Sequence, residues 1–150
     1  MKTTGFSFIE LMVAASIVGL LAMIAYPSYL SHVTKTRRAE AMNFLLQDAI
    51  YLERFYTENG CYRNKGTDGC GSSVSKGGSN PTLPYLRSPA TGTLFYTISL
   101  DDASGSNGSK YTLTADPANT PQANDGALTL DNTGKRCWSK NPSCNPIGWQ

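Results

Sequence analysis

The chain has few of the side chains that usually carry catalysis and metal binding. It has a single histidine, His32, and contains neither a His-Glu-x-x-His pair nor a phosphate-binding glycine-rich motif among its 150 residues. Charge is also scarce, because 13 basic and 11 acidic residues leave a net charge of +2, which does not by itself indicate nucleic-acid binding. We therefore predict that the protein is not an enzyme, that it has no cofactor or metal, and that His32 is an ordinary surface residue.

Charge is almost absent from the first part of the chain. Between Phe6 and Tyr26 the one charged residue is Glu10, and these 21 residues would span about 31 Å as a helix, close to the thickness of the hydrocarbon core of a bilayer. An acidic side chain costs about 2.5 to 3.5 kcal/mol at the centre of such a helix and less near its end. The segment is predicted to span a membrane, and the cost of Glu10 indicates that this residue has a role.

Two common explanations fit this segment less well. A secretory signal peptide has an apolar region of about 7 to 15 residues without a carboxylate, followed by a small-x-small cleavage site. A plain membrane anchor would leave Glu10 as an accident or as the partner of an unknown protein. A cut between Gly5 and Phe6 would instead create a free amine at Phe6, which could pair with Glu10 of a neighbouring chain in a bundle of helices.

The same residues resemble the N-terminus of the type IV pilins. The signature of that family is a short basic leader ending in Gly, cleavage by a prepilin peptidase, an N-methylated Phe and Glu as the fifth mature residue. Residues 1–5 (Met-Lys-Thr-Thr-Gly), Phe6 and Glu10 match these elements. The resemblance implies cleavage between Gly5 and Phe6, N-methylation of Phe6, assembly in a register set by Phe6 and Glu10, and a helix break at Pro27.

Beyond Pro27 the apolar run becomes an amphipathic pattern that predicts continuation of the same helix to about Asn59, where Asn59-Gly60 is a typical helix end. Glu40, Asp48 and Glu53 are interleaved with the apolar residues. The apolar residues recur at three- and four-residue steps: Met42, Leu45, Leu46, Ala49, Leu52, Phe55 and Tyr56. One face of this half of the helix is therefore predicted to cover a core.

The rest of the chain predicts a small antiparallel sheet. Residues 94–100, 111–115 and 127–131 are rich in aromatic, aliphatic and β-branched side chains, and 135–138 is a possible fourth strand. Alternation places Leu94, Tyr96, Ile98 and Leu100 on one face of the first strand. The order of helix and hairpins predicts an α+β fold. The resemblance implies the pilin fold, a long kinked N-terminal helix packed on a sheet of three to four strands.

These predictions divide the chain into three parts. Residues 1–5 are the leader peptide, 6–27 the transmembrane and assembly half of the helix, and 28–150 the head. Within the head, the helix runs to about 59, a loop covers 60–89, the sheet covers 90–138, and a C-terminal tail follows. The loop and the tail are predicted to be exposed.

Four cysteines lie beyond the membrane segment, an even number that is typical of disulfides in an exported domain. Three pairings are possible, and we favour Cys61–Cys70 and Cys137–Cys144 because each closes a short loop containing Gly or Pro. Such a loop would stabilise the head by about 2 to 3 kcal/mol. The spacings do not match the Cys-x2-4-Cys pairs of structural zinc sites.

Two groups of charged residues are candidates for binding. Lys135, Arg136 and Lys140 surround Trp138, a combination that could bind DNA phosphates beside a stacking platform, although a solvated strand edge that cations protect from aggregation is the simpler explanation. Asp101 and Asp102, together with Asp116 or Asp125, could ligate calcium. However, their spacing is not that of an EF-hand loop, and two adjacent aspartates in a hairpin are typical of a solvated turn.

The resemblance implies a structural subunit of a type IV pilus, most like a PilE-like minor pilin. It implies a single-pass inner-membrane protein with a periplasmic head, which later becomes part of an extracellular filament. The implied partners are other pilin subunits, the prepilin peptidase and the inner-membrane assembly platform. Such a filament supports pilus biogenesis, adhesion, twitching motility or DNA uptake. The alternatives are a DNA-binding competence pilin and a type II secretion pseudopilin.

Overall fold

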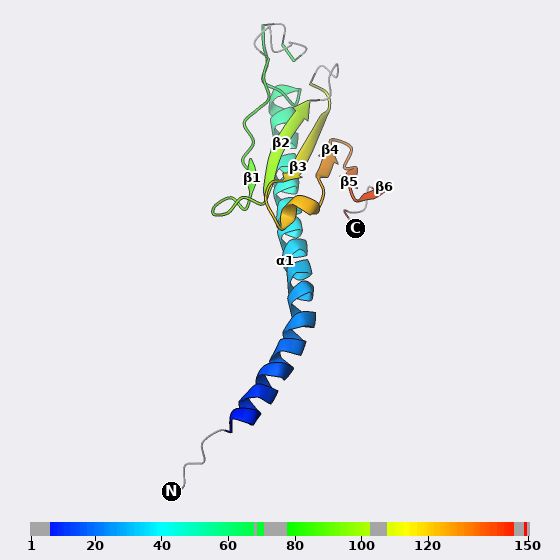
Figure 1. Cartoon of the computed structure of the whole chain (residues 1–150). Coiled ribbons are helices and arrows are strands. Elements are labelled where there is room, and N and C mark those ends of the chain that lie inside the picture. Colours follow the sequence, from blue (N-terminus) through cyan, green and yellow to red (C-terminus); the bar gives the residue numbers. More distant parts are fainter. Residues whose placement is uncertain (1–6, 68, 71–77, 103–107, 146–148, 150) are drawn as a thin grey trace. The chain divides into compact units, whose positions relative to one another are not determined.

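The computed structural model describes residues 7–67, 69–70, 78–102, 108–145 and 149. The chain forms two compact units, Met1–Lys35 and Thr36–Gln150. Helix α1, Phe8–Asn59, contributes to both, and the strands belong to the second (Figure 1). The second unit is called the head below.

Helix α1 begins at Phe8 and ends at Asn59, as the sequence pattern predicted to within two residues. Its end is fixed by Gly60, which adopts a left-handed φ of 77° and donates its backbone N–H to the carbonyl of Tyr56 over 2.7 Å. Glycine adopts this conformation without the steric cost of a Cβ atom. Pro27 lies inside α1, and the local break expected at this residue stays a prediction. A proline removes one backbone donor, and the neighbouring helical turns maintain the helix across it.

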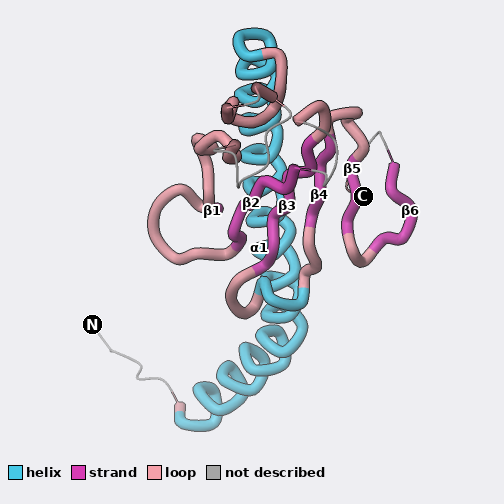
Figure 2. The backbone as a smooth tube through the Cα atoms, turned by 90° about the horizontal axis from the view of Figure 1, so that it is seen from above, coloured by secondary structure: helices cyan, strands magenta, loops and turns pink. Residues whose placement is uncertain are grey.

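The head contains a six-stranded antiparallel sheet in which neighbouring strands follow one another in sequence (Figure 2). The register of its central hairpin places Ile98 opposite Ala115 and Leu100 opposite Leu113. A short 3-10 helix, η2, Gln122–Asn124, precedes β4. The strands are β1, Arg87–Ser88; β2, Tyr96–Asp102; β3, Tyr111–Pro117; β4, Leu128–Asp131; β5, Arg136–Trp138; and β6, Asn141–Asn145.

One face of the sheet packs on the second half of α1. Alternate residues of β3 and β4 are buried, while Thr97 and Ser99 of β2 are exposed on the other face. This alternation follows from the two-residue period of a strand. The core joins three helix residues to three strands: Ala41, Leu45 and Leu52 with Tyr96, Ile98, Tyr111, Leu113, Ala115, Leu128 and Leu130. The α+β fold of a long helix on an antiparallel sheet is thus confirmed.

The structure adds two edge strands to the three or four that were predicted. Strand β1 has only two residues, and β6 contains Asn, Ser and Pro, which have low strand propensity. Local pattern therefore gave no signal for either strand. Strand β6 follows β5 through a tight turn, and the disulfide between Cys137 and Cys144 ties the two strands together.

The predicted exposure of the connecting loop and of the tail is wrong for several residues. Tyr62 and Leu83 of the loop and Trp149 of the tail are at most 7% exposed and belong to the core. The Trp149 indole donates to the carbonyl of Thr129 over 3.0 Å. Asp48, which looked like one of the polar residues interleaved in the helix pattern, is completely buried.

Candidate functional site: the apolar helix and the basic surface of the head

The described residues of the first unit form a helix with an exposed apolar surface. From Phe8 to Tyr29 every residue is exposed, including Leu20 and Ile24 at 68% and 75%. Among the described residues, α1 is the one helix whose length and composition would allow it to cross a membrane. Such a surface requires either lipid or apolar side chains of other helices around it.

Glu10 is the only charged residue described in this surface, and it lies in the first turn of α1. A carboxylate there faces the positive end of the helix dipole, which offsets part of its cost. The backbone N–H of Glu10 donates to the carbonyl of Ser7 over 3.1 Å. Gly5 and Phe6, the predicted cleavage and methylation positions, lie outside the described residues, so the pairing of Glu10 with the Phe6 amine stays a prediction.

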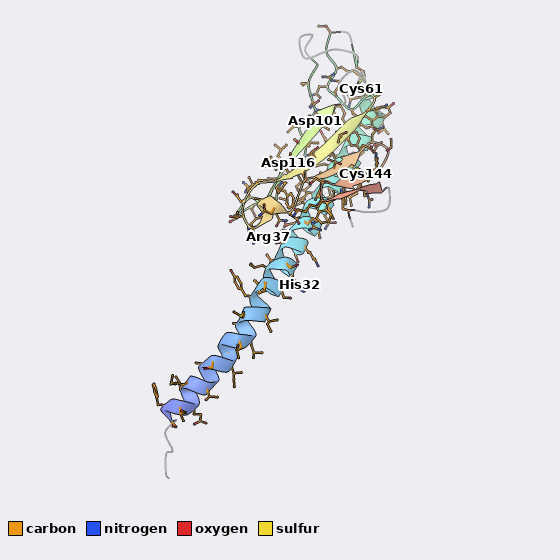
Figure 3. The ribbon with its side chains drawn as sticks, turned by 45° about the vertical axis from the view of Figure 1, so that its right-hand side comes forward. His32, Arg37, Cys61, Asp101, Asp116 and Cys144 are labelled. Atoms are coloured by element: carbon orange, nitrogen blue, oxygen red, sulfur yellow. A yellow bond between two sulfur atoms is a disulfide. The ribbon has the colours of Figure 1, made fainter. Side chains whose placement is uncertain are left out.

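Asp101, Asp116 and Asp125, three of the candidate calcium ligands, are not brought together. Asp101 lies opposite Thr112, whereas Asp116 lies opposite Thr97, so the two carboxylates occupy opposite ends of the β2–β3 hairpin (Figure 3). Asp125 is engaged with Arg38. Within the described ranges, no cluster of three or more His, Cys, Asp or Glu side chains is arranged to hold a metal ion.

An ion pair anchors the C-terminal half of the sheet to α1. The Arg38 guanidinium on α1 pairs with the carboxylate of Asp125, donating from Nε over 2.7 Å and also from Nη2. Tyr96 donates its hydroxyl to the same carboxylate, and Gln122 donates its amide over 2.9 Å. Burial by itself would raise the pKa of Asp125, but the hydrogen bonds from Arg38 and Tyr96 outweigh it and lower the pKa.

Trp138, the predicted stacking platform, belongs to this same cluster. Its indole N–H donates to the backbone carbonyl of Asp125 over 2.7 Å, and the guanidinium of Arg38 lies 3.9 Å from the centre of its ring. Arg38 therefore already occupies one face of the half-buried ring. Close packing also explains Gly126, because a Cβ atom there would lie 2.5 Å from the Ser139 hydroxyl and φ is +89°.

The cations predicted beside Trp138 differ in exposure. Lys135 and Lys140 are exposed at the two ends of β5, while Arg136 is half-buried with its guanidinium 5.2 Å from the centre of the Trp149 ring. The candidate surface thus contains two exposed lysines and a half-buried arginine, and one face of its tryptophan is covered.

A second group of exposed lysines lies near the end of α1, where sequence reasoning gave no signal. Lys65 follows Cys61 in the first disulfide loop, and Lys110 follows the turn at Gly108. The backbone N–H of Tyr62 donates to the carbonyl of Gly108 over 2.8 Å, so the two segments lie side by side. Only the folded chain brings these distant positions together.

Both disulfides join the cysteines that the sequence analysis favoured as pairs. The Cα atoms are 5.8 Å apart in Cys61–Cys70 and 4.4 Å apart in Cys137–Cys144. The first bridge closes the segment that follows α1, and the second links β5 to β6. Each disulfide therefore constrains the backbone in one of the two regions that contain exposed lysines.

The second half of α1 also has a face that the sheet leaves uncovered. It forms an open groove of about 590 Å³ in which Ile50 is 67% exposed. The lining is mostly apolar, with one acidic and one basic residue toward the end of the helix: Leu46, Ala49, Ile50, Glu53, Arg54 and Thr57. An exposed isoleucine in an apolar groove is typical of a protein contact.

Two family comparisons match this architecture. Residues 27–137 match the family described as "Type IV minor pilin ComP, DNA uptake sequence receptor". The chain belongs to this minor pilin family. Residues 1–26 match the prokaryotic N-terminal methylation motif. Pilins are structural proteins, so membership implies assembly with other pilins in a pilus, and the apolar helix and the N-terminal motif are consistent with membrane anchoring and a place in the filament.

Individual relatives are more distant. The chain is 34% identical to the fimbrial protein EcpC of Eikenella corrodens over 58 residues, which are 39% of this chain and 38% of that protein. The non-core minor pilin PilV of Neisseria meningitidis has a similar fold, with a TM-score of 0.51 and 20% identity over 80% of this chain and 99% of that one. A type IV pilin from Shewanella oneidensis has a TM-score of 0.47 and 23% identity over 77% and 98%.

Proposed function

We propose that this minor pilin is cut between Gly5 and Phe6 by a prepilin peptidase and enters the filament through the first part of α1. Before assembly, the helix would hold the protein in the inner membrane with its head in the periplasm. The observation that carries this proposal is the exposed apolar surface of Phe8–Tyr29, because contact of such a surface with water is unfavourable. In the filament, the helices of other pilins would replace lipid around it.

Glu10 and the amine of Phe6 are proposed to set the axial register in that bundle. Opposite charges attract strongly in a low-dielectric environment, and a misplaced subunit would leave both groups unpaired. N-methylation of Phe6 keeps the amine positively charged. Pro27 removes one backbone donor from α1, which would let the helix loosen locally as subunits pack.

The test is the substitution Glu10→Val, with Ser16→Ala as a matched control on the same helix. The Ser16 hydroxyl donates to the Met12 carbonyl of its own helix, so its removal leaves no charge unpaired. We expect both variants to insert in the membrane and only Glu10→Val to be depleted from sheared filaments in quantitative immunoblots. Normal incorporation of Glu10→Val would refute the register role.

A second function, DNA binding by the head, is favoured by the description of the matching family as a DNA uptake sequence receptor. The exposed cations Lys135 and Lys140 flank β5, and Lys65 and Lys110 are exposed on two neighbouring segments near the end of α1. We propose that lysines of the head contact DNA phosphates. Trp138 would support such a surface from beneath, since Arg38 covers one face of its ring.

The experiment measures binding of duplex DNA to the full chain in detergent micelles across a range of salt concentrations. Removing one lysine that binds a phosphate should reduce the slope of log affinity against log salt by about 0.9. We therefore expect the salt dependence of the affinity to become less steep in one of two double variants. The first combines Lys135→Ala with Lys140→Ala, and the second combines Lys65→Ala with Lys110→Ala. Arg54→Ala on α1 is the control. Binding that is absent, or that is unchanged in all variants, would refute DNA recognition by these lysines.

A further inference from the structure

Asp48 is a carboxyl group buried in the core of the head with few hydrogen bonds. It is 0% exposed on the face of α1 that packs against the rest of the head. Its Oδ1 accepts the backbone N–H of Tyr85 over 3.1 Å. Its Oδ2 is buried and has no hydrogen-bond partner among the described residues. A full negative charge at this position would be poorly compensated.

The group that Asp48 contacts is the backbone N–H of Tyr85, in the segment 81–88, which leads into strand β1 and includes it. Two contacts one helical turn apart join this segment to α1. Asp48 accepts the Tyr85 N–H, and the ring of Phe44 stacks on that of Tyr85 with centroids 4.5 Å apart. Leu83 is buried beside them, at 5% exposure. The hydrogen bond to Asp48 is therefore a central attachment of the segment to the helix.

Several charged and titratable groups on the surrounding elements are engaged elsewhere. On α1, Arg38 pairs with Asp125, and Glu53 accepts the Tyr62 hydroxyl over 2.9 Å. Three more such groups contact other partners: Arg87 of the segment donates to the carbonyls of Pro89 and Gly92, Tyr96 of β2 donates to Asp125, and Tyr111 of β3 donates to Glu53. A neutralising cation for Asp48 is therefore not supplied by these groups.

We propose that Asp48 is a proton-dependent latch that fastens the segment 81–88 to helix α1. When the carboxyl is protonated, it is neutral and the Tyr85 hydrogen bond holds the segment without the cost of a buried charge. When the carboxyl ionises, the charge is stabilised by water only if the segment moves away. Ionisation therefore favours opening of the segment.

The direction of the pH dependence follows from the two states of the latch. Burial raises the pKa of Asp48 to about 7 in the closed head, and the Tyr85 N–H offsets part of that rise. An opened, hydrated carboxyl returns toward the ordinary value of 3.8. Between these values opening releases a proton, so the population of the open state increases with pH and becomes constant above about pH 7.

The experiment is hydrogen–deuterium exchange of the full chain in detergent micelles between pH 4.5 and 8.5, corrected for the chemical pH dependence of exchange. We expect the protection of the peptide containing Tyr85 to fall by up to about tenfold per pH unit below pH 7 and then to level off. In Asp48→Asn that protection should not change with pH. The Asp116→Asn variant, which removes an exposed carboxylate of β3, should retain the wild-type profile.

A flat wild-type profile, or the same pH-dependent fall in Asp48→Asn, would overturn the latch. If Asp48→Asn does not fold, infrared spectroscopy of the wild-type chain provides a second test. A protonated carboxyl band should be present at pH 6 and disappear by pH 8.5. Absence of that band at pH 6 would also overturn the proposal.

Discussion

The two parts of α1 have the same secondary structure but differ in the exposure of their side chains. Residues 8–29 are mostly apolar and exposed, whereas the part within the head buries Ala41, Leu45 and Leu52 against a sheet. A helix needs an environment for its apolar side chains, and hydrogen bonding within the backbone does not provide one. The first part therefore requires lipid or other subunits, while the second part is stabilised by its own chain.

The largest effect expected within the head comes from breaking the ion pair that joins α1 to the η2 segment. Replacing Arg38 by Ala leaves the carboxylate of Asp125 buried without its cation, which costs about 3 to 5 kcal/mol in comparable buried pairs. Urea denaturation of the full chain in detergent, followed by tryptophan fluorescence, measures this loss. Arg37→Ala is the control, since Arg37 stacks on Phe95 at 3.6 Å and should cost much less.

The stabilisation of the head by the same ion pair should be lost at low pH. Because the pKa of Asp125 is lowered in the folded head, its stabilisation is complete above the ordinary value of 3.8 and disappears as the pH falls through the folded pKa. Asp125→Asn should therefore remove part of the loss of stability below about pH 4. Identical acid unfolding curves for the two proteins would show that the pair does not contribute to this loss.

A matched pair of leucine substitutions tests the contrast along α1 most simply. Leu52 is 0% exposed and Leu20 is 68% exposed. Leu52→Ala should destabilise the head by about 2 to 5 kcal/mol, while Leu20→Ala should change unfolding of the head by no more than about 0.5 kcal/mol. Equal effects in denaturation curves would contradict the division of α1 into a covered and an uncovered part.

The second disulfide should have a smaller effect than these core changes. Joint replacement of Cys137 and Cys144 by Ser opens a short loop. Because the unfolded chain then gains conformational entropy, the free energy of unfolding should fall by about 2.5 kcal/mol. Thermal unfolding should show this loss. The corresponding replacement of Cys61 and Cys70 should cost a similar amount, so a much larger loss in one bridge would identify that bridge as coupled to core packing.

The smallest effect on stability is expected at the uncovered face of the helix within the head. Ile50 is 67% exposed, so Ile50→Ala should change unfolding by no more than about 0.5 kcal/mol. The same substitution should reduce incorporation into filaments if the groove contacts another pilin. Gln47→Ala, at an exposed position outside the groove, is the control. Unchanged incorporation of Ile50→Ala would show that the groove does not contribute to assembly.

Local pattern was sufficient for most of the architecture. The apolar run, the three- and four-residue spacing and the Asn59-Gly60 pair predicted α1, and alternation predicted the inward face of β2. Loop composition was enough to favour the disulfide pairs that the structure contains. Each of these features depends on residues that are close in sequence.

Features that depend on distant residues were not predicted. Arg38 and Asp125 are 87 positions apart, and nothing in the local sequence of either residue indicates its partner. Asp48 has the local pattern of a surface residue in a helix, but the segment containing Tyr85 covers it. The tail was predicted to be exposed because it resembles the disulfide-bounded C-terminal region of pilins, whereas burial of Trp149 requires the folded sheet.

Quantitative mass spectrometry of sheared surface filaments tests the central proposal most directly, because it counts this chain against the other pilins and reads its N-terminus in the same sample. We predict a chain that begins at Phe6 and is present at a small fraction of the abundance of the principal subunit. An uncut chain that begins at Met1 and is absent from the filaments would contradict assembly through the apolar helix.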